Sequence, residues 1–273
     1  MTIKEYVADK KEKIKLVTEF GPKISLCIIQ VGDNPASNSY IKGKLKDCLE
    51  VGIDASLVRL GVDIDTDYLV NMVRELSHSA CVDGLIVQLP LPEHIDVEKV
   101  QQAIAPHRDV DGFNVMSEFV ACTPLGVMNY LAETGYNFTG KNALVIGRSD
   151  IVGKPLAKLL TDANATVTLA HSKTPRTKLI QYIETADIVF TAIDKIEFYD
   201  MSYASCFENV PVIIDIGLGK SEQGKLKGNL SSELVKHLNE HGNFVISGIG
   251  GVGLLTRLQL LINTIHAKSP TTY

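Results

Sequence analysis

Apolar, β-branched runs alternate with helix-forming stretches along most of the chain, and this alternation is the feature that most constrains the fold. The runs with strand character are 24–32, 55–61 and 84–90 in the first half, then 142–147, 165–170, 186–193, 210–217 and 243–253. Parallel strands need long crossovers, which are usually helices that cover both faces of the sheet. The pattern therefore predicts an α/β protein with parallel sheets.

The alternation is interrupted once, after the string RDVDGFN at 108–114. A chain of 273 residues has enough material for two domains of modest size. We predict two three-layer α/β domains with a cleft between them. Residues 1–120 form the first, residues 121–253 form a Rossmann-type parallel sheet, and a helix at about 254–268 packs back on the first domain.

Composition excludes several classes of partner. The net charge of −5 offers no basic surface for nucleic acid, and no apolar run reaches the roughly 20 residues of a membrane span. The first residues mix lysines with acids and lack the apolar core of a signal peptide. The five cysteines are scattered and never in C-x-x-C spacing, which is typical of reduced thiols. We expect a cytoplasmic protein with no metal site.

The string VIGRSDIVGKP, at 145–155, stands where a strand turns into a helix. Gly147 and Gly153 are six residues apart with Ser149 between them, so the spacing is not G-x-G-x-x-G. An ordinary strand-to-helix turn is one interpretation. The preceding strand, the following helix and a second strand at 165–170 favour a dinucleotide-binding turn.

The end of the second strand bears on the choice of dinucleotide. NAD sites usually place an acid there to bind the ribose 2′-hydroxyl group, whereas this chain has His171, Ser172 and Lys173. Arg148 and Lys173 are cationic and Ser172 can donate to an anion. The sequence therefore favours NADP, with NAD less favoured.

A helix beginning near residue 35 carries three lysines. Its apolar stripe is predicted to consist of Ile41, Leu45, Cys48 and Leu49. Tyr40 and Lys44 are four residues apart and share one shoulder of that stripe, whereas Lys42 and Lys46 fall on the other. Lys44 alone can work with Tyr40. The alternative is that Lys44 extends its ammonium group into water.

Two further polar features stand near strand ends. Gln88 is a lone amide at the carboxyl end of the apolar run 84–90, where open α/β sheets bind ligands. Asp109 and Asp111 precede Gly112. This second feature reads either as an Asp-Gly turn or as a carboxylate directed into the predicted cleft.

Several strings together resemble one family. They are SNSYIKGKLKDCLEVGI, GLIVQLPLP, DVDGFN, CTPLG, VIGRSDIVGKPLAKLL, ATVTLAHSKT, ADIVFTA and GGVG. Their order and approximate spacing resemble the bifunctional methylenetetrahydrofolate dehydrogenase/methenyltetrahydrofolate cyclohydrolase family, the FolD type, from about residue 20 to 265.

The resemblance implies two reactions. A hydride passes from 5,10-methylenetetrahydrofolate to NADP, and water then converts the methenyl product to 10-formyltetrahydrofolate, a one-carbon donor for purine biosynthesis. It implies a homodimer. It also implies that Lys44 is the acid/base of hydrolysis, tuned by Gln88, that Tyr40 orients the folate, and that Asp111 binds the pterin.

The same resemblance implies the binding residues. Those for substrate are Tyr40, Val87, Leu89, Asp111, Ile249, Gly250, Gly251, Val252 and Gly253. Those for the cofactor are Gly147, Arg148, Ser149, Ser172 and Leu218.

The chain departs from the family pattern in four places, one of which is the region before CTPLG, several residues shorter than usual. The folate loop reads ISGIGGVGL, without the usual prolines. The string GNL at 228–230 replaces G-D-V, and IDKIEF at 193–198 replaces a glycine-proline pair.

Two other functions remain open from the sequence. A short-chain dehydrogenase also combines Y-x-x-x-K with a Rossmann unit, but its glycine-rich turn precedes the tyrosine. A divergent homologue could bind folate or nucleotide without turnover.

Overall fold

The computed structural model describes residues 1–221 and 223–269, except the side chains at 36 and 220. The chain divides into two compact units. One, here the 123–256 unit, consists of Thr123–Thr256 with Met1 and Ile3. The other, the 4–122 unit, consists of Thr2, Lys4–Cys122 and the described residues from Arg257 to Ser269.

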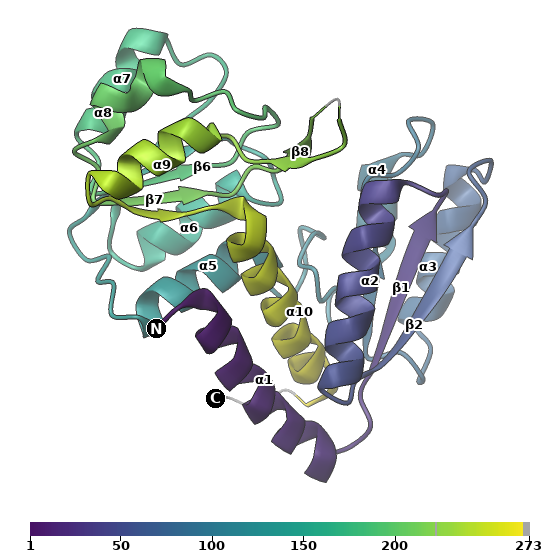
Figure 1. Cartoon of the computed structure of the whole chain (residues 1–273). Coiled ribbons are helices and arrows are strands. Elements are labelled where there is room, and N and C mark those ends of the chain that lie inside the picture. The colour runs from purple at the N-terminus through teal and green to yellow at the C-terminus, as the bar shows by residue number, and fades with distance from the viewer. Residues whose placement is uncertain (222, 270–273) are drawn as a thin grey trace. The chain divides into compact units, whose positions relative to one another are not determined.

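The 4–122 unit is built on a parallel sheet of three strands in the order β2-β1-β3. The strands are β1 (Ser25–Val31), β2 (Asp54–Leu60) and β3 (Gly84–Val87). The helices that contribute to it are α1 (Ile3–Phe20), α2 (Pro35–Glu50), α3 (Thr66–Ser77), α4 (Val97–Ala103) and most of α10 (Gly253–Lys268). Because the chain steps from β1 outward to β2 and then back across to β3, right-handed crossovers place α2 and α3 on opposite faces, as Figure 1 shows.

The 123–256 unit is built on a five-stranded parallel sheet in the order β10-β7-β6-β4-β5. Its strands are β4 (Asn142–Ile146), β5 (Thr166–Ala170), β6 (Ile188–Thr191), β7 (Val212–Asp215) and β10 (Phe244–Ile246). Its helices are α5 (Cys122–Glu133), α6 (Gly153–Asp162), α7 (Arg176–Glu184), the turn η1 (Met201–Tyr203), α8 (Ala204–Phe207), α9 (Ser232–Glu240) and η2 (Gly248–Val252). Helices α7, α8 and α9 lie on one side of this sheet, and α5 and α6 on the other (Figure 1). The predicted α/β class with a Rossmann-type sheet is confirmed.

Some elements of the 123–256 unit were not foreseen. Helices α7, α8 and α9 have nine residues or fewer, and none of them was singled out from the sequence. The antiparallel pair β8 (Gly219–Lys220) and β9 (Leu226–Lys227) has two residues a strand. Helices α7 and α9 pack on the sheet, since Leu179 of α7 and Leu234 of α9 belong to one buried cluster with residues of its strands.

The buried face of α2 differs from the predicted stripe. Leu49 is 82% exposed, so its placement in the core was wrong. Among the side chains of α2 that the structure describes, those buried are Ser37, Ile41, Lys44, Asp47 and Cys48. The face is rotated toward Asp47 because this carboxylate pairs with Lys11 of α1 and Arg257 of α10. A stripe drawn from apolar residues alone missed those charged positions.

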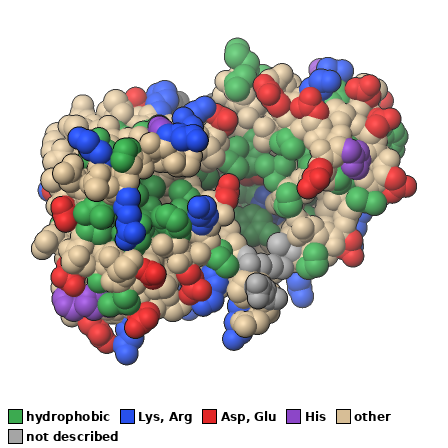
Figure 2. All heavy atoms as spheres, turned by 90° about the horizontal axis from the view of Figure 1, so that it is seen from above, with side chains coloured by type: hydrophobic (Ala, Val, Ile, Leu, Met, Phe, Trp, Pro, Cys, Tyr) green, Lys and Arg blue, Asp and Glu red, His purple; other side chains and the backbone are tan. Residues whose placement is uncertain are grey.

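The outer surface carries both signs of charge. Figure 2 shows Lys and Arg side chains together with Asp and Glu over the face in view. Among the described residues, one helical stretch, Gly248–Lys268, is long and apolar enough to cross a membrane. Two-thirds of its apolar window (67%) is buried inside the protein, as in a core helix, so it is weak evidence for a span.

Candidate active site

Lys44 is buried in the 4–122 unit. Its exposed fraction is 3%, its Nζ lies 5.2 Å from the centroid of the Tyr40 ring, and 3.5 Å from Oδ2 of Asp111. Lys42 and Lys46 are exposed. The alternative that Lys44 extends into water is therefore wrong, and helix α2 presents one lysine, with a tyrosine one turn earlier, to a buried carboxylate.

Asp111 stands in a tight turn that the backbone holds closed. The amide of Gly112 donates to the carbonyl of Asp109 at 3.0 Å, and Gly112 has a φ of +72°, in the left-handed region. A Cβ atom at Gly112 would lie 2.6 Å from the amide nitrogen of Ala121, so only glycine fits there. The Asp-Gly turn is therefore present, and it places the Asp111 carboxylate beside Lys44.

Helix α10 supports this turn from behind. The Asn263 amide donates to the carbonyl of Val110 at 2.9 Å, and the Cys122 thiol donates to the same carbonyl at 3.2 Å. Complete burial raises the pKa of the Cys122 thiol well above its usual range, which keeps it a neutral donor. Neither residue was singled out from the sequence, because their role depends on contacts between segments about 140 residues apart.

Asp109 is a second buried carboxyl group beside the site. Burial raises its pKa to about 6, and the charge of Asp111 adds to that rise. Its Oδ2 atom accepts a hydrogen bond from the backbone amide of Asn114 at 2.7 Å. Within the described residues, its Oδ1 atom has no hydrogen-bond partner. Asp109 is therefore a carboxyl group able to exchange a proton close to neutral pH.

Gln88 follows β3 at the carboxyl end of the sheet. Its backbone amide donates to Ile29 at 2.8 Å, which extends the β1–β3 pairing, and its side-chain nitrogen donates to the Leu89 carbonyl at 2.8 Å. In the part of the chain that the structure describes, the buried Oε1 atom accepts no hydrogen bond. An unpaired buried acceptor is costly, so it is an expected contact point for a ligand or an ammonium group. Val87, one residue earlier, is buried and Leu89 is half-buried.

The 123–256 unit presents a second group of predicted residues, at the carboxyl edge of its sheet. Gly147 follows β4 with φ of +128°, and a Cβ atom there would collide with the carbonyl of Ala192. A Cβ atom on Gly153 would collide with the carbonyl of Gly147. Strand, turn and the start of α6 are therefore packed at backbone distance, which is the geometry that brings helix N–H groups close to a pyrophosphate.

The flanking cofactor candidates are on the surface of that edge. Arg148, Ser149 and Ser172 are exposed, and β4 and β5 pair in parallel from Asn142 to Ile146. Residues that directly follow these two strands therefore share one edge. Leu218, beyond the end of β7, is 42% exposed. The arrangement fits a nicotinamide dinucleotide, with cationic and hydroxyl groups beside a glycine turn.

The segment that corresponds to the folate loop also belongs to the 123–256 unit. Ser247 accepts the Ile249 amide at 3.3 Å, and Gly250 has φ of +73°. Ile249 is 49% exposed, whereas Gly251 and Val252 are buried. Gly253 begins α10. Buried neighbours and a left-handed glycine shape this loop in place of the missing prolines.

Two departures from the family pattern contact each other. The Asn229 amide nitrogen donates to the carbonyls of Ile193 at 2.8 Å and Lys195 at 2.7 Å, and its oxygen accepts the Ile193 amide. The backbone amide of Asn229 donates to Asp215. Asparagine at this position thus holds the loop that replaces the glycine-proline pair, and an aspartate could not donate to either carbonyl.

Restoring the family residue with Asn229→Asp is therefore expected to lower the free energy of unfolding by about 2–4 kcal/mol, since a buried carboxylate would face two carbonyls that have lost their donor. Urea denaturation measures the change. Asn137→Asp is the matched control, because that exposed side chain accepts the Thr139 amide and donates to no group among the described residues. It should shift stability by less than about 0.5 kcal/mol. Equal stability of Asn229→Asp and wild type would contradict the assigned contacts.

The fold and the two groups of residues define a class: an α/β protein with a dinucleotide-binding sheet and a buried lysine-carboxylate pair. Two family models match the chain. Residues 1–111 match the tetrahydrofolate dehydrogenase/cyclohydrolase catalytic domain, and residues 121–271 match the NAD(P)-binding domain of the same family. The chain belongs to the tetrahydrofolate dehydrogenase/cyclohydrolase family.

Individual relatives agree. The bifunctional protein FolD of Brevibacillus brevis is 40% identical over 251 residues, covering 89% of this chain and 86% of the relative. The crystal structure of the bifunctional enzyme FolD from Campylobacter jejuni matches with a TM-score of 0.88 and 34% identity, covering 98% of each chain. The crystal structure of the Trypanosoma brucei FolD enzyme, complexed with NADP and an inhibitor, matches with a TM-score of 0.84 and 25% identity. The match covers 100% of this chain and 98% of the relative. The predicted dehydrogenase and cyclohydrolase activities are confirmed at the level of the family, and a short-chain dehydrogenase is excluded.

Proposed function

We propose that this chain oxidises 5,10-methylenetetrahydrofolate with NADP and hydrolyses the methenyl product to 10-formyltetrahydrofolate, with Lys44 as the acid/base of hydrolysis. The observation that carries the proposal is the burial of the Lys44 ammonium group between the Tyr40 ring and Asp111, at 5.2 Å and 3.5 Å respectively. A lysine that only extends its charge into water would be exposed and would not contact a buried carboxylate.

In the hydrolytic step, water adds to the methenyl carbon and loses a proton, and one carbon–nitrogen bond of the imidazolinium ring breaks. Lys44 Nζ takes up that proton and gives it to the ring nitrogen whose bond to the carbon breaks, while the remaining hydroxyl proton of the adduct passes to solvent. The unpaired Oε1 atom of Gln88 accepts a hydrogen bond from the ammonium group or from the attacking water. This contact would hold the amine in one orientation while its charge changes.

Tyr40 and Asp111 position the substrate. The ring of Tyr40, half-buried beside Lys44, offers an apolar face for the flat pterin or its attached ring. The Asp111 carboxylate accepts hydrogen bonds from the polar edge of the pterin. Val87 and Leu89 border the folate from β3, and residues Ile249 to Gly253 supply the outer folate loop.

The bound nicotinamide accepts the hydride, and the protein supplies alignment. Gly147 and Ser149 place the turn against the pyrophosphate, and Leu218 packs against the nicotinamide end. Arg148 and Ser172 accommodate the 2′-phosphate, because both are exposed at the edge where an NAD site would carry an acid. The NADP complex of the Trypanosoma brucei relative supports the same choice.

The remaining proposals concern the setting of the enzyme. We expect a cytoplasmic homodimer that supplies formyl groups for purine biosynthesis. It has no nucleic-acid or membrane partner, and the net charge of −5 supports this expectation.

The cofactor proposal predicts that kcat/KM for NADP exceeds that for NAD by at least about tenfold, since one cationic contact to the 2′-phosphate contributes about 1.4 kcal/mol or more. The measurement is the absorbance of the reduced nicotinamide formed from 5,10-methylenetetrahydrofolate with each dinucleotide. Arg148→Gln should reduce the ratio by lowering only the NADP value. A chain that binds both ligands without forming reduced nicotinamide would refute turnover, and a ratio below one would refute the assigned role of Arg148 and Ser172.

A further inference from the structure

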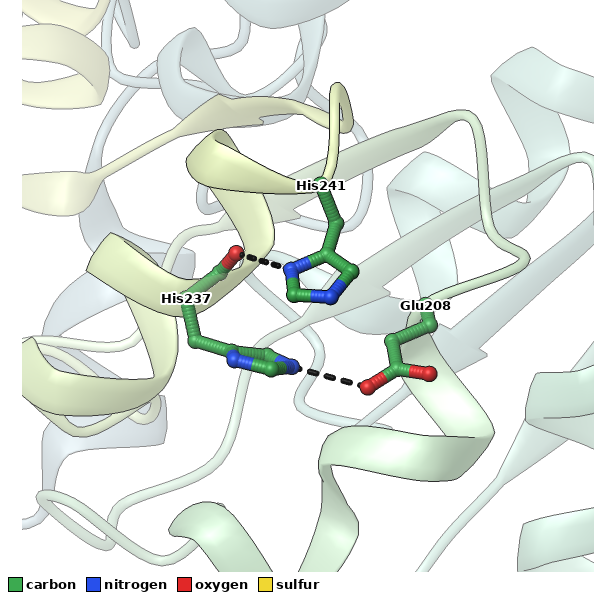
Figure 3. A group of neighbouring side chains, drawn as sticks. All are labelled: Glu208, His237 and His241. Atoms are coloured by element: carbon green, nitrogen blue, oxygen red, sulfur yellow. Dashed lines mark hydrogen bonds and ion pairs between the residues drawn. The ribbon is translucent and has the colours of Figure 1, made fainter.

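Outside the proposed active site, two histidines and a glutamate converge on the surface of the 123–256 unit. Glu208 caps the end of α8, and His237 and His241 are four residues apart at the end of α9. The ligand atoms of all three lie within 4.8 Å of one another. Figure 3 shows the two rings side by side with the carboxylate directed at the ring of His237.

The hydrogen bonds already fix much of the orientation that a metal ligand needs. His241 Nδ1 lies 2.9 Å from the carbonyl of His237, and because a carbonyl can only accept, this nitrogen carries the proton. In the neutral ring Nε2 therefore keeps its lone pair. Metal-binding histidines are commonly oriented in this way, with the second nitrogen bonded to a carbonyl or carboxylate.

His237 points its other nitrogen to the same place. Its Nε2 atom lies 2.8 Å from Oε1 of Glu208, and the two ring centroids are 4.0 Å apart. Ligand atoms around a tetrahedral Zn²⁺ are separated by about 3.3 Å, given metal–ligand bonds of roughly 2.0–2.1 Å. Small rotations of partly exposed side chains would bring the three atoms to that spacing, as the neutral ring of His237 moves its proton to Nδ1.

The backbone beneath the three residues is tied together. The buried Asn243 amide donates to the carbonyls of Glu208 at 3.0 Å and Val210 at 2.7 Å. The segment that follows His241 is thereby joined to the end of α8, so the ligands come from two elements held at fixed distance. The carbonyl end of α9 also carries a partial negative charge that favours a cation.

We propose that Glu208, His237 and His241 form a binding site for a divalent transition metal of the Zn²⁺ class, with the fourth position open to water. Two imidazoles and one carboxylate suit Zn²⁺ better than Mg²⁺ or Ca²⁺, which prefer oxygen ligands. The expectation of no metal site came from cysteine spacing and overlooked the H-x-x-x-H pair.

The position of the site in the fold separates it from catalysis. Glu208 precedes β7 and His241 precedes β10, so both lie at the amino edge of the parallel sheet. The cofactor candidates follow their strands at the carboxyl edge. A strand of four residues separates the edges by roughly 13 Å. The metal therefore links α8 to α9 and stabilises the unit without touching the reacting groups.

The test is equilibrium dialysis and calorimetry of the untagged, reduced full chain with Zn²⁺ alone, and visible absorption with Co²⁺ alone. We expect one Zn²⁺ per chain with a micromolar Kd, a higher Tm in its presence, and unchanged dehydrogenase activity. His241→Asn and Glu208→Gln should each weaken binding by about tenfold or more, and the double variant His237→Asn/His241→Asn should abolish it.

His78→Asn is the matched control. His78 also ends a helix with Nδ1 bonded to the carbonyl four residues earlier, at 2.7 Å, but it belongs to no three-residue group among the described residues. This variant should bind Zn²⁺ like wild type. Metal binding that survives in the double variant, that falls equally in His78→Asn, or that is weaker than about 1 mM in wild type would overturn the proposal. The Tm of each variant without metal shows whether it is folded. If a histidine variant is not folded, Glu208→Gln alone serves as the test.

Discussion

Lys44→Met is expected to lower the rate of methenyltetrahydrofolate hydrolysis by about 10²–10⁴-fold, the usual contribution of a positioned acid/base. The 3% exposed ammonium group beside Asp111 would be lost, and methionine offers no proton. The formation of reduced nicotinamide should fall much less, since hydride transfer needs alignment of donor and acceptor rather than a proton from this residue. Loss of methenyltetrahydrofolate absorbance measures the first activity, and gain of NADPH absorbance measures the second.

The same helix provides the controls. Lys42→Met and Lys46→Met remove a positive charge from exposed positions on α2 and should leave both activities within about twofold of wild type. Lys44→Arg keeps the charge but cannot give up a proton near neutral pH, so it should resemble Lys44→Met. Equal losses from the three methionine variants, or full hydrolysis by Lys44→Arg, would refute the proposed proton transfer.

The predictable part of the fold follows from burial. Strands such as Gly84–Val87 are buried along their whole length and read as continuous apolar runs, so both parallel sheets were found from the sequence. The helices α7 and α9 have nine residues each and carry only two buried positions each, and both were missed. The missed helix α9 and the residue that caps its end supply two of the proposed metal ligands.

Local spacing was sufficient for part of the candidate site and insufficient for the rest. The four-residue separation of Tyr40 and Lys44 fixes their common side of α2, and the structure brings the pair together. Asp111 was also singled out, but Asn263 and Cys122, which hydrogen-bond to the neighbouring Val110 carbonyl, were not. Asn263 acts through a hydrogen bond to Val110, 153 residues away in sequence, and no local pattern reveals such a partner.

The largest expected loss of stability comes from Asp47, which lies at the meeting point of three helices. Its carboxylate oxygens lie 2.7 Å from Lys11 Nζ of α1 and 2.7 Å from Arg257 Nε of α10. Burial lowers the pKa of Lys11, but hydrogen bonds to Asp47 and Glu50 outweigh that effect and leave the pKa raised. Gly43 allows the close approach, since a side chain there would collide with the Arg257 guanidinium. This contact explains why a glycine stands in the middle of α2, although glycine costs about 1 kcal/mol in a helix interior.

Asp47→Ala is therefore expected to lower the free energy of unfolding by about 3–5 kcal/mol, because it leaves the buried Lys11 charge with only the more exposed Glu50 and deprives Arg257 of its partner. Asp9→Ala is the control on α1. It breaks an exposed i,i+4 pair with Lys13, whose side chains are 50% and 65% exposed, and should cost at most about 0.5 kcal/mol. Guanidinium denaturation of both variants measures the difference. If Asp47→Ala lost no more than Asp9→Ala, the three helices would be held by apolar packing alone, and α2 would owe the position of Lys44 to Ile41 and Cys48 rather than to charge.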